Sequence, residues 1–561
     1  MNKMISKIYE RQNSLTPLKR LTLFVMVLTV VTLYNSCSTG ESEGKMVFHY
    51  NQPEGIGSLD PAFAKNQANM WAVHQLYNTL VETNDSLLPA PSLATRWEIS
   101  DDRRVYTFYI RSDVYFHPDA AFGANAVRRL TAHDVEYSFK RLVNKATASP
   151  GAWVFNGKVD PDQGFVALND SVFQLKLIRP YNPILGILSM QYCSVVAKEA
   201  VELYGAEFRK HPCGSGPFRF SAWEEGQALI LLKNDHYFER DSKGQSLPYL
   251  DAVKVSFLDS KASEFLEFQQ GRLDFINDID ASFKDEVLTK KGELRKDWEG
   301  KIVLQKHAYL TIEYLGILVD SANPIVEASP LRLKKIRQAI NYGFDRRKMM
   351  MYLRNSIGFP AESGFIPVGL PSFDSNAVKG YHYDPAKAAE LLKEAGFPDG
   401  KGLPAIKLLT VPVYAELANF IARELQEIGI PVQVEAIQKS LLLEQTAKSQ
   451  AGFFRASWIG DYPDAENFLN VFLGKNPAPP NYTRFKNAVY DDLFAKAMAA
   501  PDINTQNQLY QQMDQLVMNE APVVPLWYDM VIHLVNPRVV NFLPNSLNLL
   551  ELRQVKIVKL R

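Results

Sequence analysis

Two carboxylates stand three residues apart in the segment Asp461-Tyr462-Pro463-Asp464. A pair of acids can hydrolyse a glycosidic bond, because one protonates the leaving oxygen while the other activates water or attacks the sugar. Pro463 breaks any helix between the two acids, so their side chains need not share a face. A hydrolase that uses Asp461 and Asp464 is therefore kept only as the lesser interpretation of this segment.

Other patterns typical of catalysis are missing from the sequence. It contains no His-Glu-x-x-His, no pair of Cys-x-x-Cys motifs and no phosphate loop that ends in Gly-Lys-Ser/Thr. The segment 213–217 resembles Gly-x-Ser-x-Gly but lacks the first glycine, and its two glycines and proline predict a turn before a strand at 218–220. The nine histidines include no pair spaced i, i+4. We therefore predict no enzyme, no metal site and no cofactor.

The composition is that of a large folded protein. The chain has 561 residues, of which 46% are hydrophobic and 22% charged. A single hydrophobic core rarely grows beyond about 300 residues, so two or three lobes are expected. The 62 basic and 62 acidic side chains balance, which indicates no surface for nucleic acid.

The N-terminus carries an export signal. Lys19-Arg20 precedes an apolar stretch at 21–33, which is too short to span a bilayer but suits a signal peptide over 1–36. Cys37 follows a small residue just after this stretch, as in a lipoprotein cleavage site, so lipidation of its thiol is predicted. The polar residues 37–45 then form a tether. A secreted protein without a lipid is the alternative.

Two cysteines remain after Cys37. Cys193 and Cys213 could pair in an oxidising compartment, or could be two buried free thiols, and their spacing does not decide between these alternatives.

Short strands and capped helices alternate after residue 45, which indicates α/β lobes. The stretch 104–111 is β-branched and aromatic at successive positions, as in a strand covered on both faces. Thr131 and Asp134 occupy the positions of a capping box, so a helix is expected to begin at Ala132.

Two further helices are marked at their ends. Asp384 suits a cap and Pro385 the first helical position, while Gly396 ends the apolar stripe. A basic helix is predicted over 333–344, with Asp345 placed to cap the next one. These helices are interpreted as scaffold.

Taken together, several segments resemble the family 5 solute-binding proteins, the oligopeptide-, dipeptide- and nickel-binding group of ABC importers. The likeness covers about 46–545, and its motifs follow the family's order. The segments are Gly57-Ser58-Leu59-Asp60-Pro61, 76–81, 93–102, 106–116, 130–139, 211–218, 248–251, 271–274, 336–342, 383–385 and Trp458-Ile459-Gly460-Asp461-Tyr462-Pro463-Asp464.

The resemblance implies a two-lobed periplasmic-binding-protein fold of type II, cluster C-like. It has α/β lobes, an extra domain in the first lobe, and two crossing strands as a hinge. By analogy, domain I would combine 46–77, 201–305 and 525–561. Domain II would be 78–200, and domain III, the second lobe, 306–524.

The resemblance also implies a ligand site. Asp461 would neutralise the ligand's α-ammonium, because enclosing a charged ammonium without a partner costs several kcal/mol. Trp458 would form an apolar wall beside Asp461, and the backbone of 458–460, which includes Ile459 and Gly460, could pair with a peptide as an added strand. Arg455 could meet the ligand carboxylate, with a structural ion pair or a surface position as alternatives.

The first lobe contributes two further segments by the same resemblance. Lys65-Asn66-Gln67 matches backbone-contacting positions, so Asn66 and Gln67 are candidate ligand residues. Gly151 lies in another cleft loop but stands where the family often has an aromatic residue. This departure leaves the ligand class open.

The expected function is that of a substrate-binding lipoprotein of a peptide ABC transporter. It would capture an oligopeptide between its lobes and deliver it to a permease in the inner membrane, acting as a monomer anchored in the periplasm or cell envelope. The alternative is the same fold with a nickel chelate, haem or a saccharide as ligand.

Overall fold

The computed structural model describes residues 44–125 and 127–559, and the described residues from 46 onward form one compact unit. The predicted signal peptide and Cys37 lie outside the described residues. In the part of the chain that is described, no helix combines the length and the hydropathy that crossing a bilayer requires.

One sheet of eleven strands runs through this unit in the order β15-β14-β16-β12-β17-β11-β1-β10-β9-β8, with β13 paired to β17 off this path. The strands are β1 (Val47–Asn51), β8 (Phe218–Glu224), β9 (Ala228–Lys233), β10 (Ala252–Ser256), β11 (Phe275–Asn277), β12 (Val303–Ile317), β13 (Phe359–Pro360), β14 (Ile406–Thr410), β15 (Val432–Ala436), β16 (Phe453–Ile459) and β17 (Val523–Val535).

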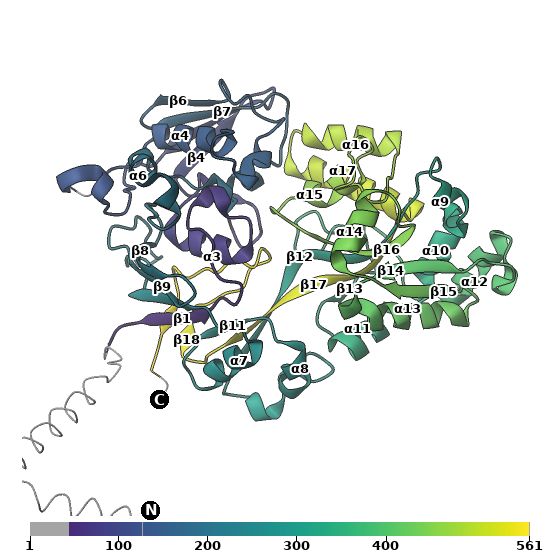
Figure 1. Ribbon diagram of the computed structural model, residues 1–561. Coiled ribbons are helices and arrows are strands. Elements are labelled where there is room, and N and C mark those ends of the chain that lie inside the picture. Colours follow the sequence, from purple (N-terminus) through teal and green to yellow (C-terminus); the bar gives the residue numbers. More distant parts are fainter. Residues whose placement is uncertain (1–43, 126, 560–561) are drawn as a thin grey trace, which may run out of the picture. The chain divides into compact units, whose positions relative to one another are not determined.

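β12 and β17 join the two lobes. They pair antiparallel from Val303↔Val535 to Gly316↔Val523, and together they pass between β11 on one side and β16 on the other (Figure 1). The register shifts between Ala308 and Ile312. The expected two-lobed fold with two connecting strands is confirmed, while the predicted domain bounds stay a prediction.

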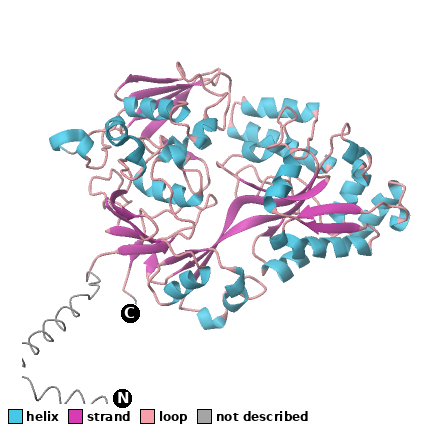
Figure 2. Cartoon of the chain, in the orientation of Figure 1, coloured by secondary structure: helices cyan, strands magenta, loops and turns pink. Residues whose placement is uncertain are grey.

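The extra domain of the first lobe holds a separate antiparallel sheet in the order β4-β5-β7-β6, with α4 (Ala132–Val143) in contact with β6 and β7 (Figure 2). Its strands are β4 (Ala94–Ile99), β5 (Val105–Ile110), β6 (Phe165–Asn169) and β7 (Val172–Lys176). Burial alternates along β5, so only the face of Tyr106, Phe108 and Ile110 is fully covered. The prediction of a strand covered on both faces was therefore wrong, because Val105, Thr107 and Tyr109 on the other face are only half-buried.

The predicted helix signals are confirmed. Thr131 and Asp134 form both halves of a capping box at the start of α4. α12 (Pro385–Glu394) begins after Asp384, whose carboxylate accepts a hydrogen bond from the Lys387 amide at 2.9 Å.

The second lobe packs its helices around the parallel pair β14–β15. α10 (Lys334–Tyr342) buries Ile336 and Ile340 in a core shared with α12, α13 (Ala415–Glu427) and β14. Asp345 caps α11 (Arg346–Arg354) by accepting from the Lys348 amide. The basic helix and the cap predicted after it are therefore also present.

The remaining helices and strands connect these layers. They are α3 (Gln67–Leu76), α5 (Ile184–Leu188), α6 (Lys198–Tyr204), α7 (Lys261–Gln269), α8 (Ala281–Val287), α9 (Pro324–Glu327), α14 (Lys439–Ala447), α15 (Glu466–Leu469), α16 (Ala488–Met498), α17 (Ile503–Glu520), β2 (Val81–Thr83), β3 (Pro89–Pro91), β18 (Val539–Val540) and β19 (Lys556–Ile557).

The turn before β8 is built by close backbone approach. A Cβ at Gly214 would lie 2.0 Å from the Leu76 carbonyl oxygen, and one at Gly216 would lie 2.4 Å from the Leu76 carbonyl carbon. Only glycine fits at these two positions, which explains the spacing that resembled a catalytic elbow. Cys193 and Cys213 are both free and buried, and burial raises the pKa of each thiol.

Candidate ligand-binding site

Asp461 lies two residues beyond the end of β16. Its side chain is exposed, and its hydrogen bonds within the described residues run to one neighbour. Asn467 donates from Nδ2 to the Asp461 Oδ2 at 3.3 Å, and the Asn467 Oδ1 accepts from the Asp461 amide at 3.2 Å. No lysine, arginine or histidine in the described residues pairs with this carboxylate. Asp461 is thus a positioned negative charge without a cation of its own.

The surroundings of Asp461 weaken its solvation. Although Asp461 is exposed, the protein around it removes part of its hydration, and this desolvation raises its pKa, while the Asn467 hydrogen bond acts in the opposite direction. The charge of Asp461 in turn contributes, after burial, to raising the pKa of Tyr192 to about 12, and it is a smaller contribution to the raised pKa of Tyr309. Tyr192 belongs to the first lobe and Tyr309 to the connecting strand β12, so the charge of Asp461 acts on groups of both parts.

The segment before Asp461 has a buried side and an open side. The indole Nε1 of Trp458 donates to the same Asn467 Oδ1 at 3.0 Å, so Trp458 and Asp461 share one anchor. Ile459 is 53% exposed. The Gly460 amide donates to the Leu310 carbonyl at 2.7 Å, and a Cβ at Gly460 would lie 3.0 Å from the Phe468 ring. Gly460 therefore serves close packing between β12 and α15.

Arg455 is already paired. Its guanidinium donates to Glu313 on β12 and lies 3.9 Å from the centre of the Tyr414 ring, with only 15% of the side chain exposed. Burial raises the pKa of Glu313 to about 7, although Arg455 acts to lower it. The Arg455 Nε is buried and has no hydrogen-bond partner in the described part of the chain. The structural alternative for Arg455 is thus the arrangement present here, and a ligand role for it stays a prediction.

The two first-lobe candidates are engaged in local contacts. Asn66 caps α3, where its Oδ1 accepts from the Asn69 amide at 3.0 Å. The Gln67 Oε1 accepts from the Asn277 Nδ2 at 3.1 Å. Both residues are partly exposed, and these bonds fix the direction of the segment that the resemblance assigns to ligand contact.

Gly151 is explained by a residue that sequence reasoning missed. It lies in a short helix at Pro150–Val154, and a Cβ there would lie 2.2 Å from the Tyr192 ring. The aromatic ring thus rests directly on the Gly151 backbone and fills the space that any side chain at 151 would need. No local signal pairs residues 41 positions apart, so only packing could reveal this contact.

The acids after Asp461 have structural partners that reach the other lobe. The buried Glu466 accepts from the Tyr181 hydroxyl at 2.9 Å and from the Tyr462 hydroxyl, and burial raises its pKa. Asp464 accepts from the Tyr510 hydroxyl at 2.7 Å and from the Glu466 amide at 2.8 Å. The hydrolase interpretation needed Asp464 as a free acid or base, and here both of these donors converge on one of its oxygens.

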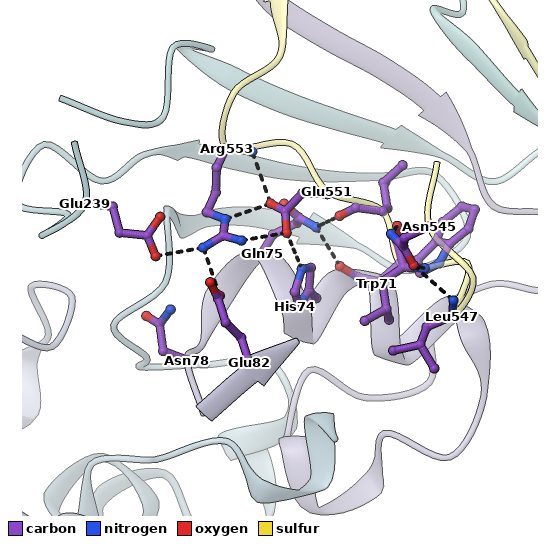
Figure 3. A network of polar contacts seen from close by, with 12 residues as sticks. Trp71, His74, Gln75, Asn78, Glu82, Glu239, Asn545, Leu547, Glu551 and Arg553 are labelled. Atoms are coloured by element: carbon purple, nitrogen blue, oxygen red, sulfur yellow. Dashed lines mark hydrogen bonds and ion pairs between the residues drawn. The ribbon is translucent and has the colours of Figure 1, made fainter. Parts of the chain in front are cut away.

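A polar cavity of about 520 Å³ lies in the first lobe near the connecting strands, lined among others by Gln191 and His307. Figure 3 shows its charged centre, in which Arg553 donates to three carboxylates. They are Glu82 at 3.0 Å, Glu239 at 2.7 Å and Glu551 at 2.8 Å. The network ties β2 and the segment before β10 to the C-terminal segment.

Comparison with known proteins decides the class. Residues 89–480 match the model of the bacterial extracellular solute-binding proteins, family 5 middle region. This chain belongs to that family. The family 5 protein is therefore a transport binding protein and not an enzyme, which confirms the resemblance and sets aside the hydrolase.

Relatives cover nearly the whole chain. The family 5 protein is 27% identical to heme-binding protein A of Haemophilus influenzae over 83% of this chain and 84% of the relative. It is 23% identical to the dipeptide-binding protein DppE of Bacillus subtilis over 91% and 92% of the two chains. The solved structure of HbpA2 from Haemophilus parasuis superposes with a TM-score of 0.80 at 23% identity, covering 92% of this chain and all of that one.

Proposed function

We propose that the family 5 protein captures an oligopeptide-like ligand through its free amino terminus and delivers it to the permease of an ABC importer. The observation that carries the proposal is Asp461, a carboxylate that pairs with no cation of the described residues and is followed directly by Tyr462 and Pro463, which lie against the first lobe. An ammonium placed there would form a charge-assisted hydrogen bond in a partly desolvated site, where such bonds are strongest.

Peptide capture needs recognition of what all peptides share. Asp461 can bind the terminal ammonium, and the open side of 458–460 can offer backbone groups to an extended chain. Contacts made by both lobes at once favour a closed state, which is the form that a permease would read. DppE, a relative, is named as a dipeptide-binding protein, which supports this ligand class.

The decisive measurement is peptide affinity by isothermal titration calorimetry after Asp461→Asn. We expect the affinity to fall by about tenfold or more, because the ammonium loses its counter-charge, while the thermal midpoint stays within about 2 °C. Asp101→Asn, an exposed acid in a turn, is the matched control. Unchanged affinity in Asp461→Asn would reject the role of this residue.

A second candidate ligand is haem, favoured by the name of the relative heme-binding protein A. Native mass spectrometry of the purified protein distinguishes the two candidates. A series of peptide masses supports the proposal, whereas a haem mass with a Soret absorbance band supports the alternative. The same spectrum would show whether the protein is the expected monomer.

The anchor proposed at Cys37 would confine the protein to the membrane surface of the periplasm or envelope, provided that more than one acyl chain is attached. Metabolic labelling with a palmitate analogue tests this. We expect label in the wild type and none in Cys37→Ser, which should move to the soluble fraction. Label that persists in Cys37→Ser would reject this site, and Cys213→Ser, which changes a buried thiol, is the control.

A further inference from the structure

The hydroxyl of Tyr192 takes no part in the hydrogen bonds that hold the described fold together. Tyr192 lies in the short helix Gln191–Cys193 of the first lobe, and no residue within the described parts of the chain forms a hydrogen bond with its hydroxyl. The side chain is 8% exposed, yet it is not among those with an orphaned buried polar atom, so the hydroxyl still reaches solvent.

The Tyr192 ring is held in place by Gly151. A Cβ at Gly151 would lie 2.2, 2.5 and 2.7 Å from three atoms of the ring, which is closer than any side chain allows. The ring is therefore supported on one side by bare backbone. Such support fixes the ring plane without using its polar group.

The first-lobe surface around Tyr192 meets the segment that carries Asp461. Trp153, two residues after Gly151, has its ring centre 6.3 Å from that of Tyr462. A Cβ at Gly186 would lie 3.7 Å from Pro463. Asp461 directly precedes the two residues that contact this surface, so its carboxylate lies at the edge of the first-lobe surface that carries Tyr192.

We infer that Tyr192 is a ligand-contacting residue which, together with Asp461 on the other lobe, clamps the cationic terminus of the bound molecule. This inference rests on the proposed function, because it names the first-lobe partner of the same ammonium. Asp461 supplies the counter-charge, and Tyr192 supplies a hydroxyl that reaches solvent and can accept a hydrogen bond. Because the two residues lie on different lobes, an ammonium between them favours closure.

Tyr192→Ala and Tyr192→Phe test the inference with a random tripeptide library in two forms, with free amino termini and N-acetylated. Retention is measured by mass spectrometry after gel filtration. We expect the wild type to retain free peptides, Tyr192→Phe, which removes the hydroxyl, to lose about threefold in affinity, and Tyr192→Ala, which also removes the ring that positions the site, about tenfold or more. Tyr115→Ala, which removes an exposed tyrosine of the same domain, should change nothing.

A double-mutant cycle with Gly151 separates ligand contact from folding. Gly151→Ala pushes the ring aside without removing it, so it should weaken retention of free peptides as Tyr192→Ala does. In the double variant Gly151→Ala/Tyr192→Ala the added methyl group has no ring to displace. The Gly151→Ala effect on thermal midpoint should therefore disappear, and retention should equal that of Tyr192→Ala alone.

The outcomes divide cleanly. If the wild type prefers free amino termini, Asp461→Asn loses this preference and Tyr192→Ala keeps it, the inference about Tyr192 is wrong and the proposed function stands. If the wild type retains neither library, or retains both equally, the proposed function fails and the clamp with it.

Discussion

The Arg553 network and the Asp461 site are both acidic, yet their charges are arranged in opposite ways. Arg553 lies among Glu82, Glu239 and Glu551, so each of these carboxylates forms an ion pair with the same cation. Among the described residues, the carboxylate of Asp461 has only the side-chain amide of Asn467 as a hydrogen-bond partner. A carboxylate that is paired with a cation of the same protein stabilises the fold. A carboxylate that is held in place without such a cation is available to a ligand.

The largest effect should follow from removing the cation of the Arg553 network. Arg553→Met leaves three carboxylates near one another without their cation, so the free energy of unfolding should fall by about 2–4 kcal/mol. Urea denaturation followed by circular dichroism measures this change. Peptide affinity of the folded fraction should remain that of the wild type, and a selective loss of affinity would place the network in the ligand site.

Lowering the pH should weaken ligand binding at Asp461. Asp461 must be ionised to pair with an ammonium, and its free-protein pKa lies above the ordinary value because of burial. Affinity should therefore be full well above that pKa and fall as the pH drops through it, by about tenfold for each unit below it. Calorimetric titrations from pH 8 to pH 4 test this. The profile of Asp461→Asn should be flat, and a parallel decline in both proteins would assign the titration to another group.

A smaller effect concerns the contribution of Asp464 to stability. Burial raises the pKa of this carboxyl to about 7. The folded protein holds this proton across a range in which an unfolded aspartate, with a pKa near 3.9, has lost it. Stability from this group is thus greatest below that range and is lost as the pH rises toward about 7.

Asp464→Asn keeps an acceptor oxygen for Tyr510 and the Glu466 amide but cannot ionise. Relative to the wild type, the variant should gain about 1 kcal/mol or more between pH 5 and pH 8. Urea midpoints at the two pH values provide the comparison. Equal differences at both values would mean that Asp464 titrates as an ordinary surface acid.

The smallest effect is expected for an exposed ion pair. Arg104 and Asp102 lie 2.8 Å apart, and about half of each side chain is exposed (52% and 50%), so Arg104→Ala should change the free energy of unfolding by about 0.5 kcal/mol or less. The same urea titration serves as the reference for Arg553→Met. A loss as large as that of Arg553→Met would mean that pairing alone, and not the shared buried cation, accounts for the network.

Local chemistry was readable from the sequence. The caps at Thr131, Asp384 and Asp345 depend on residues three or four positions apart, and all three helices begin where they predict. The order of weak motifs was enough to identify the family and its two-lobed fold.

Contacts between distant residues could not be predicted in this way. The pairing of Arg455 with Glu313 joins residues 142 positions apart, and the support of Tyr192 by Gly151 depends on two separate loops. The half-covered face of β5 was missed because aromatic residues on both sides of a strand do not reveal whether a second layer exists. The roles of the candidate site residues stay predictions until binding is measured.

The interruption between β12 and β17 has a mechanical consequence. From Ala308 to Ile312 strand β12 advances four residues while β17 advances two, from Met530 to Tyr528. Regular pairing between the two strands that join the lobes is therefore interrupted there. A ribbon twists most easily where its cross-links are missing. We therefore expect the lobes to twist relative to each other most easily at this stretch. Tyr309 lies within it, and the charge of Asp461 contributes to the raised pKa of Tyr309.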